Sequence, residues 1–163
     1  MDPLTASPLR YVLDACVMVD MLGSQRPRHS QARDLADLLT SRDMACCAPA
    51  TVLIEIQTAA SQELKANNAP MTPGRADLDI WPFDFWTIPI DQQFIVDYVY
   101  PFKSIPSLDM PRGGDLPYLY IAMMHRIPLV TEDIPLRNLA ERWAAFGLPI
   151  RAISMEECLE ELR

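Results

Sequence analysis

The chain has 163 residues, enough for one domain with a sizeable core. Half of its residues are hydrophobic and 22% are charged, as in ordinary globular proteins, and no apolar stretch approaches the ~20 residues of a membrane-spanning helix. The net charge of −8 argues against a protein that coats nucleic acid non-specifically, because such proteins gain affinity from a basic surface. An acidic enzyme can still act on nucleic acid where bound metal cations invert the local charge.

The opening residues MDPLTASPLR contain no basic segment followed by an apolar one, so they do not predict a signal peptide, and we expect a cytoplasmic protein. The four cysteines form no CxxC pair and include the adjacent Cys46 and Cys47. This spacing suits neither a structural zinc site nor a disulfide framework. We therefore expect buried free thiols.

The first half of the chain alternates apolar runs with amphipathic segments, a pattern typical of alternating strands and helices. The predicted elements are a strand at Tyr11–Leu13, a helix at Val17–Leu22, a helix from Ser30 to about Ser41, a strand at Met44–Ala48 and a helix from Thr51 to about Asn67. Ser30 and Thr51 are expected to cap their helices, because their hydroxyls can accept a hydrogen bond from a first-turn N–H.

The segment Pro70–Thr87 combines helix-breaking residues with a cluster of aromatic ones. Its prolines and glycine exclude a long regular element, whereas the aromatic side chains require burial. We expect an ordered loop or insertion at about residues 70–87, packed on its own domain or on a partner.

The second half is predicted to contain a strand at Ile88–Ile90, a helix from Asp91 to about Tyr100, a connection at Pro101–Gly114, a helix from Asp115 to about Arg126, a strand at Pro128–Thr131, a helix at Ile134–Phe146, a strand at Ile150–Ile153 and a helix at Met155–Leu162. Strands that alternate with helices predict a largely parallel sheet covered on both faces. We expect one α/β domain, a three-layer α/β/α sandwich.

Three aspartates follow strands or begin helices in this reading. Asp14 comes directly after the first strand, Asp133 lies shortly after the strand at Leu129, and Asp115 begins a helix. Ligands of parallel sheets bind at the carboxyl ends of the strands, so these side chains can converge on one edge. Each also has an ordinary structural explanation, since Asp115 and Asp133 can cap helices and Asp14 can simply end a strand.

Glu55 stands within the apolar sequence Val52–Ile56. A buried carboxylate is costly unless it is paired or bound to a metal. The structural alternative is a glutamate that points to solvent on an amphipathic helix, since polar residues follow at Gln57, Ser61 and Gln62.

Four blocks of the chain, in order, resemble the acidic motifs of the PIN domain family. They are Tyr11–Val19 with Asp14, Pro49–Ile56 with Glu55, Gly114–Ala122 with Asp115, and Pro128–Asp133 with its Thr-x-Asp ending. The resemblance covers roughly residues 10–154 and implies a PIN-like fold for residues 1–163.

The resemblance implies metal-dependent cleavage of RNA phosphodiester bonds, often by a toxin of a bacterial toxin–antitoxin pair. Its site residues would be the metal ligands Asp14, Glu55, Asp115 and Asp133, with the Thr131 hydroxyl helping to organise them. Mg²⁺ or Mn²⁺ suits such oxygen ligands, and two ions about 4 Å apart can activate water and stabilise the leaving oxygen. The implied partners are RNA, a small antitoxin protein and a second copy of the chain in a homodimer, with no membrane.

Two alternatives remain open from the sequence. The family usually has a small hydroxyl or amide residue two positions after the first Asp, where this chain has Cys16, a weaker hydrogen bonder. This difference favours a catalytically silent PIN-like binding or scaffold module. A phosphotransfer domain with Asp14 as nucleophile is disfavoured, because the only lysines, Lys65 and Lys103, lie away from the expected carboxyl edge.

Overall fold

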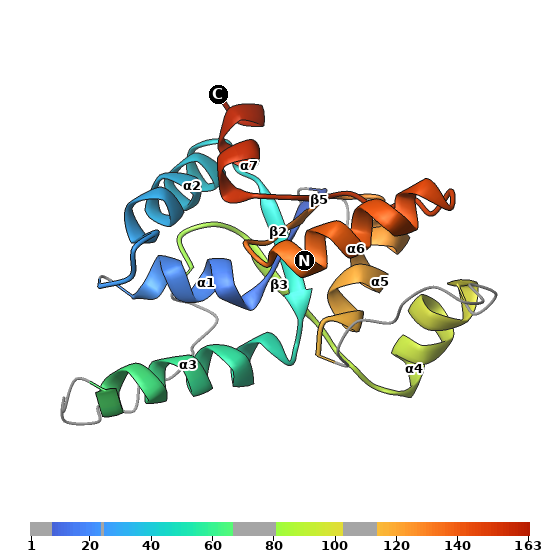
Figure 1. Ribbon diagram of the computed structural model, residues 1–163, viewed down its shortest axis with the longest axis horizontal. Helices are drawn as coiled ribbons and strands as arrows, with labels where there is room; N and C mark the ends of the chain where they lie inside the picture. The colour runs from blue at the N-terminus through green and yellow to red at the C-terminus, as the bar shows by residue number, and fades with distance from the viewer. Residues whose placement is uncertain (1–7, 24, 67–80, 103–113) are drawn as a thin grey trace, which may run out of the picture.

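The protein is a three-layer α/β/α sandwich built on a five-stranded parallel sheet (Figure 1). The computed structural model describes residues 8–23, 25–66, 81–102 and 114–163. The strands are β1 (Leu9–Leu13), β2 (Ala45–Pro49), β3 (Phe85–Ile88), β4 (Leu129–Val130) and β5 (Ala152–Ile153). Their order in the sheet is β3-β2-β1-β4-β5, and the predicted fold class is confirmed.

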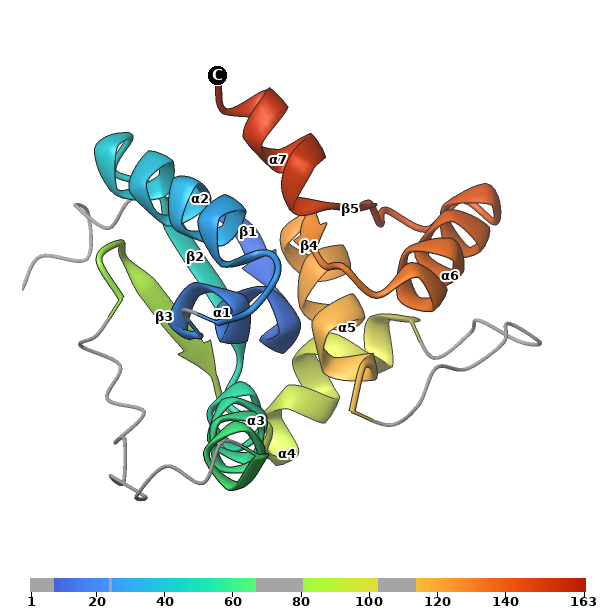
Figure 2. The same cartoon turned by 60° about the vertical axis from the view of Figure 1, so that its left-hand side comes forward.

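Helices connect successive strands. They are α1 (Ala15–Leu22), α2 (His29–Ser41), α3 (Val52–Ala66), α4 (Gln92–Phe94), the π-helix η2 (Ile95–Val99), the 3-10 helix η3 (Tyr100–Phe102), α5 (Leu116–His125), α6 (Ile134–Ala145) and α7 (Met155–Glu161). Helix α1 contacts α2 and α3, and α2 contacts α7, whereas α5 packs on β1, β2 and β4 (Figure 2).

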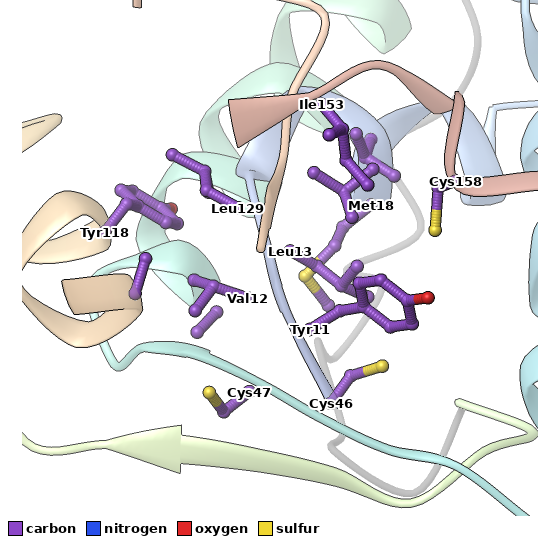
Figure 3. Packing of buried hydrophobic residues seen from close by; sticks show 14 of the residues in the cluster. Tyr11, Val12, Leu13, Met18, Cys46, Cys47, Tyr118, Leu129, Ile153 and Cys158 are labelled. Carbon is purple, nitrogen blue, oxygen red and sulfur yellow. The ribbon is translucent and has the colours of Figure 1, made fainter. Parts of the chain in front are cut away.

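The buried residues of the central strands alternate between the two faces of the sheet. Figure 3 shows Val12 and Cys47 on the side of Tyr118 from α5, and Tyr11 and Cys46 on the side of α1 and α7. All of these side chains are at most 7% exposed, as expected for a parallel sheet covered on both faces. The cysteines of the core, Cys46, Cys47 and Cys158, are free thiols, as predicted.

The strand order places a topological switch point between β1 and β4. From β1 the chain proceeds through β2 to β3 on one side, whereas β4 leads to β5 on the other. Because parallel crossovers are right-handed, helices that leave β1 and β4 cover opposite faces of the sheet. The loops after these two strands therefore diverge at the carboxyl edge of the sheet, and the crevice at such a switch point is where doubly wound sheets generally bind ligands.

The predicted loop or insertion at about residues 70–87 is wrong at its end, because Phe85–Ile88 forms the edge strand β3, paired in parallel with β2. The strand predicted at Ile88–Ile90 is accordingly misplaced. Aromatic and β-branched residues favour a pleated surface, and Pro89 lacks the N–H needed to continue the ladder. Residues 67–80 lie outside the described residues.

The aromatic side chains of this segment pack on their own domain. Trp81, Phe83 and Phe85 contact one another with ring centroids 5.8–6.3 Å apart, and Phe83 is buried. Trp86 alternates to the other side of β3 and is 51% exposed. The cluster therefore anchors the edge strand to the core.

The two caps predicted from Ser30 and Thr51 are wrong. Helix α2 already begins at His29, whose ring Nδ1 lies 2.9 Å from the Asp20 carbonyl oxygen. Thr51 directly precedes α3, but its buried hydroxyl accepts no hydrogen bond from a first-turn N–H among the described residues. Asp91 does cap its helix, through the Phe94 N–H, but that helix changes to a π-helix after one turn.

Two expectations on the ends of helices lie partly outside the described residues. The predicted helix end at Asn67 and most of the predicted connection at Pro101–Gly114 lie outside the residues that the structure describes. In the described ranges, no helix is both long and apolar enough to cross a membrane.

Candidate functional site

The crevice between β1 and β4 is bounded by Asp14 and Thr131, the residues that follow the two strands. The Asp14 N–H donates a hydrogen bond of 3.1 Å to the Val130 carbonyl oxygen, and the Thr131 N–H donates one of 2.9 Å to Ile153. These bonds extend the sheet ladder to the two residues. The backbone positions of Asp14 and Thr131 are therefore fixed by the sheet. Both residues lie at the carboxyl ends of strands, where the sequence predicted them.

Asp14 is only 9% exposed, so its carboxylate requires partners. The Thr131 hydroxyl donates a 2.5 Å hydrogen bond to Oδ2 of Asp14, and the Cys16 thiol donates one of 3.1 Å to the same oxygen. Within the described residues both hydrogen bonds fall on Oδ2, which leaves Oδ1 available to a ligand. Asp14 begins helix α1 without capping it, so its carboxylate is not used by the helix.

Cys16 occupies the position where the resemblance predicted a hydroxyl or amide. Its sulfur donates to Asp14, accepts from the Glu132 N–H at 3.5 Å and lies 3.8 Å from the Thr131 hydroxyl oxygen. Burial and the neighbouring Asp14 carboxylate raise the pKa of the Cys16 thiol. The thiol therefore stays protonated and remains a hydrogen-bond donor to Asp14.

Glu55 lies in the first turn of α3, and the negative charges of Asp14 and Asp115 act on its carboxyl. Burial raises the pKa of Glu55, the hydrogen bond from Tyr118 lowers it, and the negative charges of Asp14 and Asp115 raise it further. Glu55 is half-buried, and its Oε1 accepts a hydrogen bond of 3.1 Å from the Tyr118 hydroxyl, so its carboxyl is partly withdrawn from solvent.

Asp115 and Asp133 differ in what their carboxylates do at helix ends. Asp115 precedes α5 without capping it, and its charge acts on Glu55. Asp133 accepts a hydrogen bond of 3.0 Å from the Leu136 N–H and so caps α6. Asp133 is exposed, but its own N–H donates to the Thr131 hydroxyl at 3.1 Å, which joins it to the Asp14 network.

The carboxylates offer the oxygen donors and the negative charge that a hard divalent cation prefers. They are not preassembled for one. In the part of the chain that the structure describes, no group of three or more His, Cys, Asp or Glu side chains stands at a spacing that could hold a metal ion.

Two residues of the site were not singled out from the sequence. Tyr118 donates a hydrogen bond of 3.1 Å to Oε1 of Glu55, and its position three residues after Asp115 on a helix was the available signal. Glu132 accepts from the Met155 N–H at 2.7 Å and lies 3.4 Å from Arg28. It ties the loop after β4 to α7 and α2, an arrangement that no local pattern predicts.

Comparison of the chain with models of known protein families gave no match, and comparison with curated protein sequences gave none either.

Proposed function

We propose that the chain is a metal-dependent ribonuclease that hydrolyses RNA phosphodiester bonds, with its site in the crevice between β1 and β4. One observation supports the proposal: the negative charges of Asp14 and Asp115 act on Glu55, a half-buried carboxyl on a third element, and raise its pKa. Such a concentration of negative charge is unfavourable unless a cation relieves it.

The acidic motifs add a second line of support. Asp14, Glu55, Asp115 and Asp133 occupy the positions that the PIN resemblance assigns to metal ligands. Mg²⁺ or Mn²⁺ would be held by the first three, with Asp133 at the exposed margin. When bound, the ions supply an activated water molecule and offset the charge of the phosphate.

The protein's own residues hold the carboxylates in place. Thr131 and Cys16 fix one oxygen of Asp14, and Tyr118 fixes one oxygen of Glu55. The only histidines, His29 and His125, lie outside this group: His29 contacts the Asp20 carbonyl, and His125 the Tyr98 hydroxyl. The mechanism therefore relies on carboxylates and cations rather than on a histidine base.

The proposed biological role is that of a toxin controlled by a small antitoxin protein. The charge of −8 suits a basic protein partner better than direct attachment to an RNA backbone. We include a homodimer in the proposal, as implied by the family resemblance.

Cleavage of a mixed single-stranded RNA pool tests the activity. Wild type should cut with Mg²⁺ or Mn²⁺ and stop with EDTA, and Asp14→Asn should lose activity by at least 100-fold, as about 3 kcal/mol of lost transition-state stabilisation would give. The matched control is Asp37→Asn, the same chemical change at an exposed residue of α2. It should cleave like wild type.

Cleavage that persisted in EDTA, or an Asp14→Asn variant as active as wild type, would contradict the proposal. Folded wild type that cuts no RNA with either metal would favour the second candidate, a catalytically silent binding module. One observation favours the binding module: among the described residues, no three His, Cys, Asp or Glu side chains are placed so that they could hold a metal ion.

A further inference from the structure

The strand β5 borders a groove that the proposed site does not use. The groove has a volume of about 540 Å³ and is lined by β5 with the residues before it, by the second half of α6 and by α7. Figure 2 shows β5 with α7 on one side and α6 on the other. In the part of the chain that the structure describes, β5 pairs with β4 alone, so its other edge carries no strand.

The two helices of the groove belong to opposite faces of the sheet. Helix α6 connects β4 to β5 in the direction away from β1, whereas the connection from β1 to β2 runs in the other direction. Because parallel crossovers are right-handed, α6 lies on the face opposite to α1 and α2. Helix α7 contacts α2 and therefore lies on the same face as α2. A groove lined by both α6 and α7 must follow the edge of the sheet, along β5.

The hydrogen bonds of β5 show which of its residues is directed to the free edge. The Arg151 carbonyl oxygen accepts a hydrogen bond of 2.9 Å from the Leu129 N–H of β4. The Ile153 carbonyl oxygen accepts one of the same length from the Thr131 N–H, on the same side. Successive residues of a strand direct their backbone groups to opposite edges, so Ala152 directs its N–H and C=O away from β4. No backbone hydrogen bond on that side of Ala152 is found among the described residues.

The walls of the groove leave room for another backbone. Three of the lining residues are alanines, namely Ala140, Ala144 and Ala152. Such short side chains allow a second main chain to reach the spacing of about 4.8 Å that paired strands require. Extended peptides bind to exposed sheet edges in this way.

The charge of the groove indicates what kind of segment it accepts. Among the described residues, four glutamates line it, whereas its one arginine, Arg151, already forms an ion pair with Glu161. The glutamates are Glu141 of α6 and Glu157, Glu160 and Glu161 of α7. A second copy of the chain would bring the same carboxylates against one another, and like charges oppose such pairing. A segment rich in lysine or arginine would instead meet opposite charge on both walls.

We propose that the free edge of β5 and its groove are a docking site for an extended, basic segment of a partner protein, which adds a strand to the sheet. Ala152 exchanges main-chain hydrogen bonds with one residue of that segment, and the glutamates bind the lysine or arginine side chains that flank it. The proposal uses no cation and no residue of the crevice between β1 and β4. It therefore goes beyond the proposed function and does not depend on it.

The experiment is fluorescence anisotropy of a labelled peptide of alternating lysine and valine, titrated with the full chain in EDTA at physiological salt. Wild type should bind this peptide. A peptide of the same sequence with N-methylated backbone amides should not bind, because it keeps the charge but has no main-chain donors. A peptide of alternating glutamate and valine should not bind either, because the groove repels it.

Two variants test the two parts of the docking site. Ala152→Pro removes the N–H at the free edge, at a position where an edge strand tolerates proline, and should raise the peptide Kd by about 3- to 10-fold. The double variant Glu141→Gln/Glu160→Gln neutralises one carboxylate on each helix and should raise it by about 2- to 10-fold. The matched control is Glu156→Gln, an exposed position of α7 that lines the separate groove against α2. It should bind like wild type.

Equal binding of the lysine–valine peptide and its N-methylated form would mean that charge alone holds the peptide, and would overturn strand addition. No binding at millimolar peptide would overturn the docking site altogether. Sedimentation of the chain alone gives a further outcome: a dimer that is lost in Ala152→Pro would assign the edge to a second copy instead of a basic partner. Urea unfolding checks the fold of each variant, and the comparison of the two peptides on wild type decides the question even where Ala152→Pro does not fold.

Discussion

The Thr131 hydroxyl makes hydrogen bonds that connect the ends of β1 and β4. Its side chain is fully buried, donates to Asp14 Oδ2 and accepts from the Asp133 N–H. A single hydroxyl thereby joins the ends of β1 and β4 and the start of α6. Serine or threonine alone offers this combination of donor and acceptor on so short a side chain.

Thr131→Val should destabilise the protein by about 1–3 kcal/mol, because it leaves a buried carboxylate oxygen and a backbone N–H without this partner. Urea unfolding measures the change. The control is Thr58→Val on α3, where the exposed hydroxyl bonds only to the Ile54 carbonyl oxygen of its own helix. If both variants lost the same stability, the Thr131 network would contribute nothing specific.

At the scale of elements, two aspartates at helix starts differ in their hydrogen bonds. Asp133 caps α6, whereas Asp115 precedes α5 without a capping bond. The same residue type at the same helix position therefore caps one helix and not the other. A sequence pattern cannot distinguish the two, because the difference lies in the side-chain rotamer and the neighbouring charges.

Two substitutions of Asp133 test whether it acts in the site as well as in the cap. Asp133→Ala should cost about 1 kcal/mol of unfolding free energy, whereas Asp133→Asn should preserve stability, because asparagine also caps helices. If Asp133 contributes its charge to catalysis, Asp133→Asn should still lose RNA cleavage. An Asp133→Asn variant with full activity would assign the residue to the cap alone.

Helix α7 provides a pH-dependent prediction. Its capping box joins Ser154 and Glu157, and the hydrogen bonds from Ser154 lower the pKa of Glu157. A carboxyl whose folded pKa is lowered stabilises the fold above its unfolded pKa and loses that contribution as pH falls through the folded value.

Glu157→Gln should therefore be less stable than wild type at pH 7, and the gap should shrink at an acidic pH below the lowered folded pKa of Glu157. Unfolding by urea at the two pH values measures the difference. Glu160→Gln, on the same helix and exposed, should show no such trend. A stability gap of the same size at both pH values would contradict the assigned role of the Glu157 charge.

At the scale of the whole molecule, negative charge opposes the stability of the fold. The charges of Asp14 and Asp115 disfavour the ionised form of Glu55 in a chain whose net charge is already −8. The packed core must offset their repulsion when no cation is present. A cation that binds the native state alone stabilises the protein by mass action.

Mn²⁺ at one hundred times its Kd should stabilise wild type by about 2.7 kcal/mol, and removal of the ion with EDTA should reverse the effect. Thermal unfolding should show a rise in Tm of several degrees for wild type and a much smaller one for Asp14→Asn. Asp37→Asn is the control and should respond like wild type. An equal rise in Tm for wild type and Asp14→Asn would place the cation away from this crevice.

Local sequence determined the type and approximate position of most elements. Apolar runs mark the strands at Tyr11–Leu13 and Leu129–Val130, and amphipathic spacing marks the helix over Ile134–Ala145. These patterns are informative because burial on both faces of a sheet, or on one face of a helix, constrains the residues directly. The same patterns placed Asp14 and Thr131 at the carboxyl ends of strands.

Tertiary structure alone decided the order of the strands, the identity of the edge strand β3 and the neighbours of each carboxylate. The Phe85–Ile88 strand pairs with a distant β2, and the contacts of Tyr118 with Glu55 and of Cys16 with Glu132 span long stretches of chain. The strength of such contacts depends on burial and distance in space, which spacing along the chain does not fix. The sequence by itself thus determined which residues stand at the strand ends, and the packing of the helices decided which of them face one another.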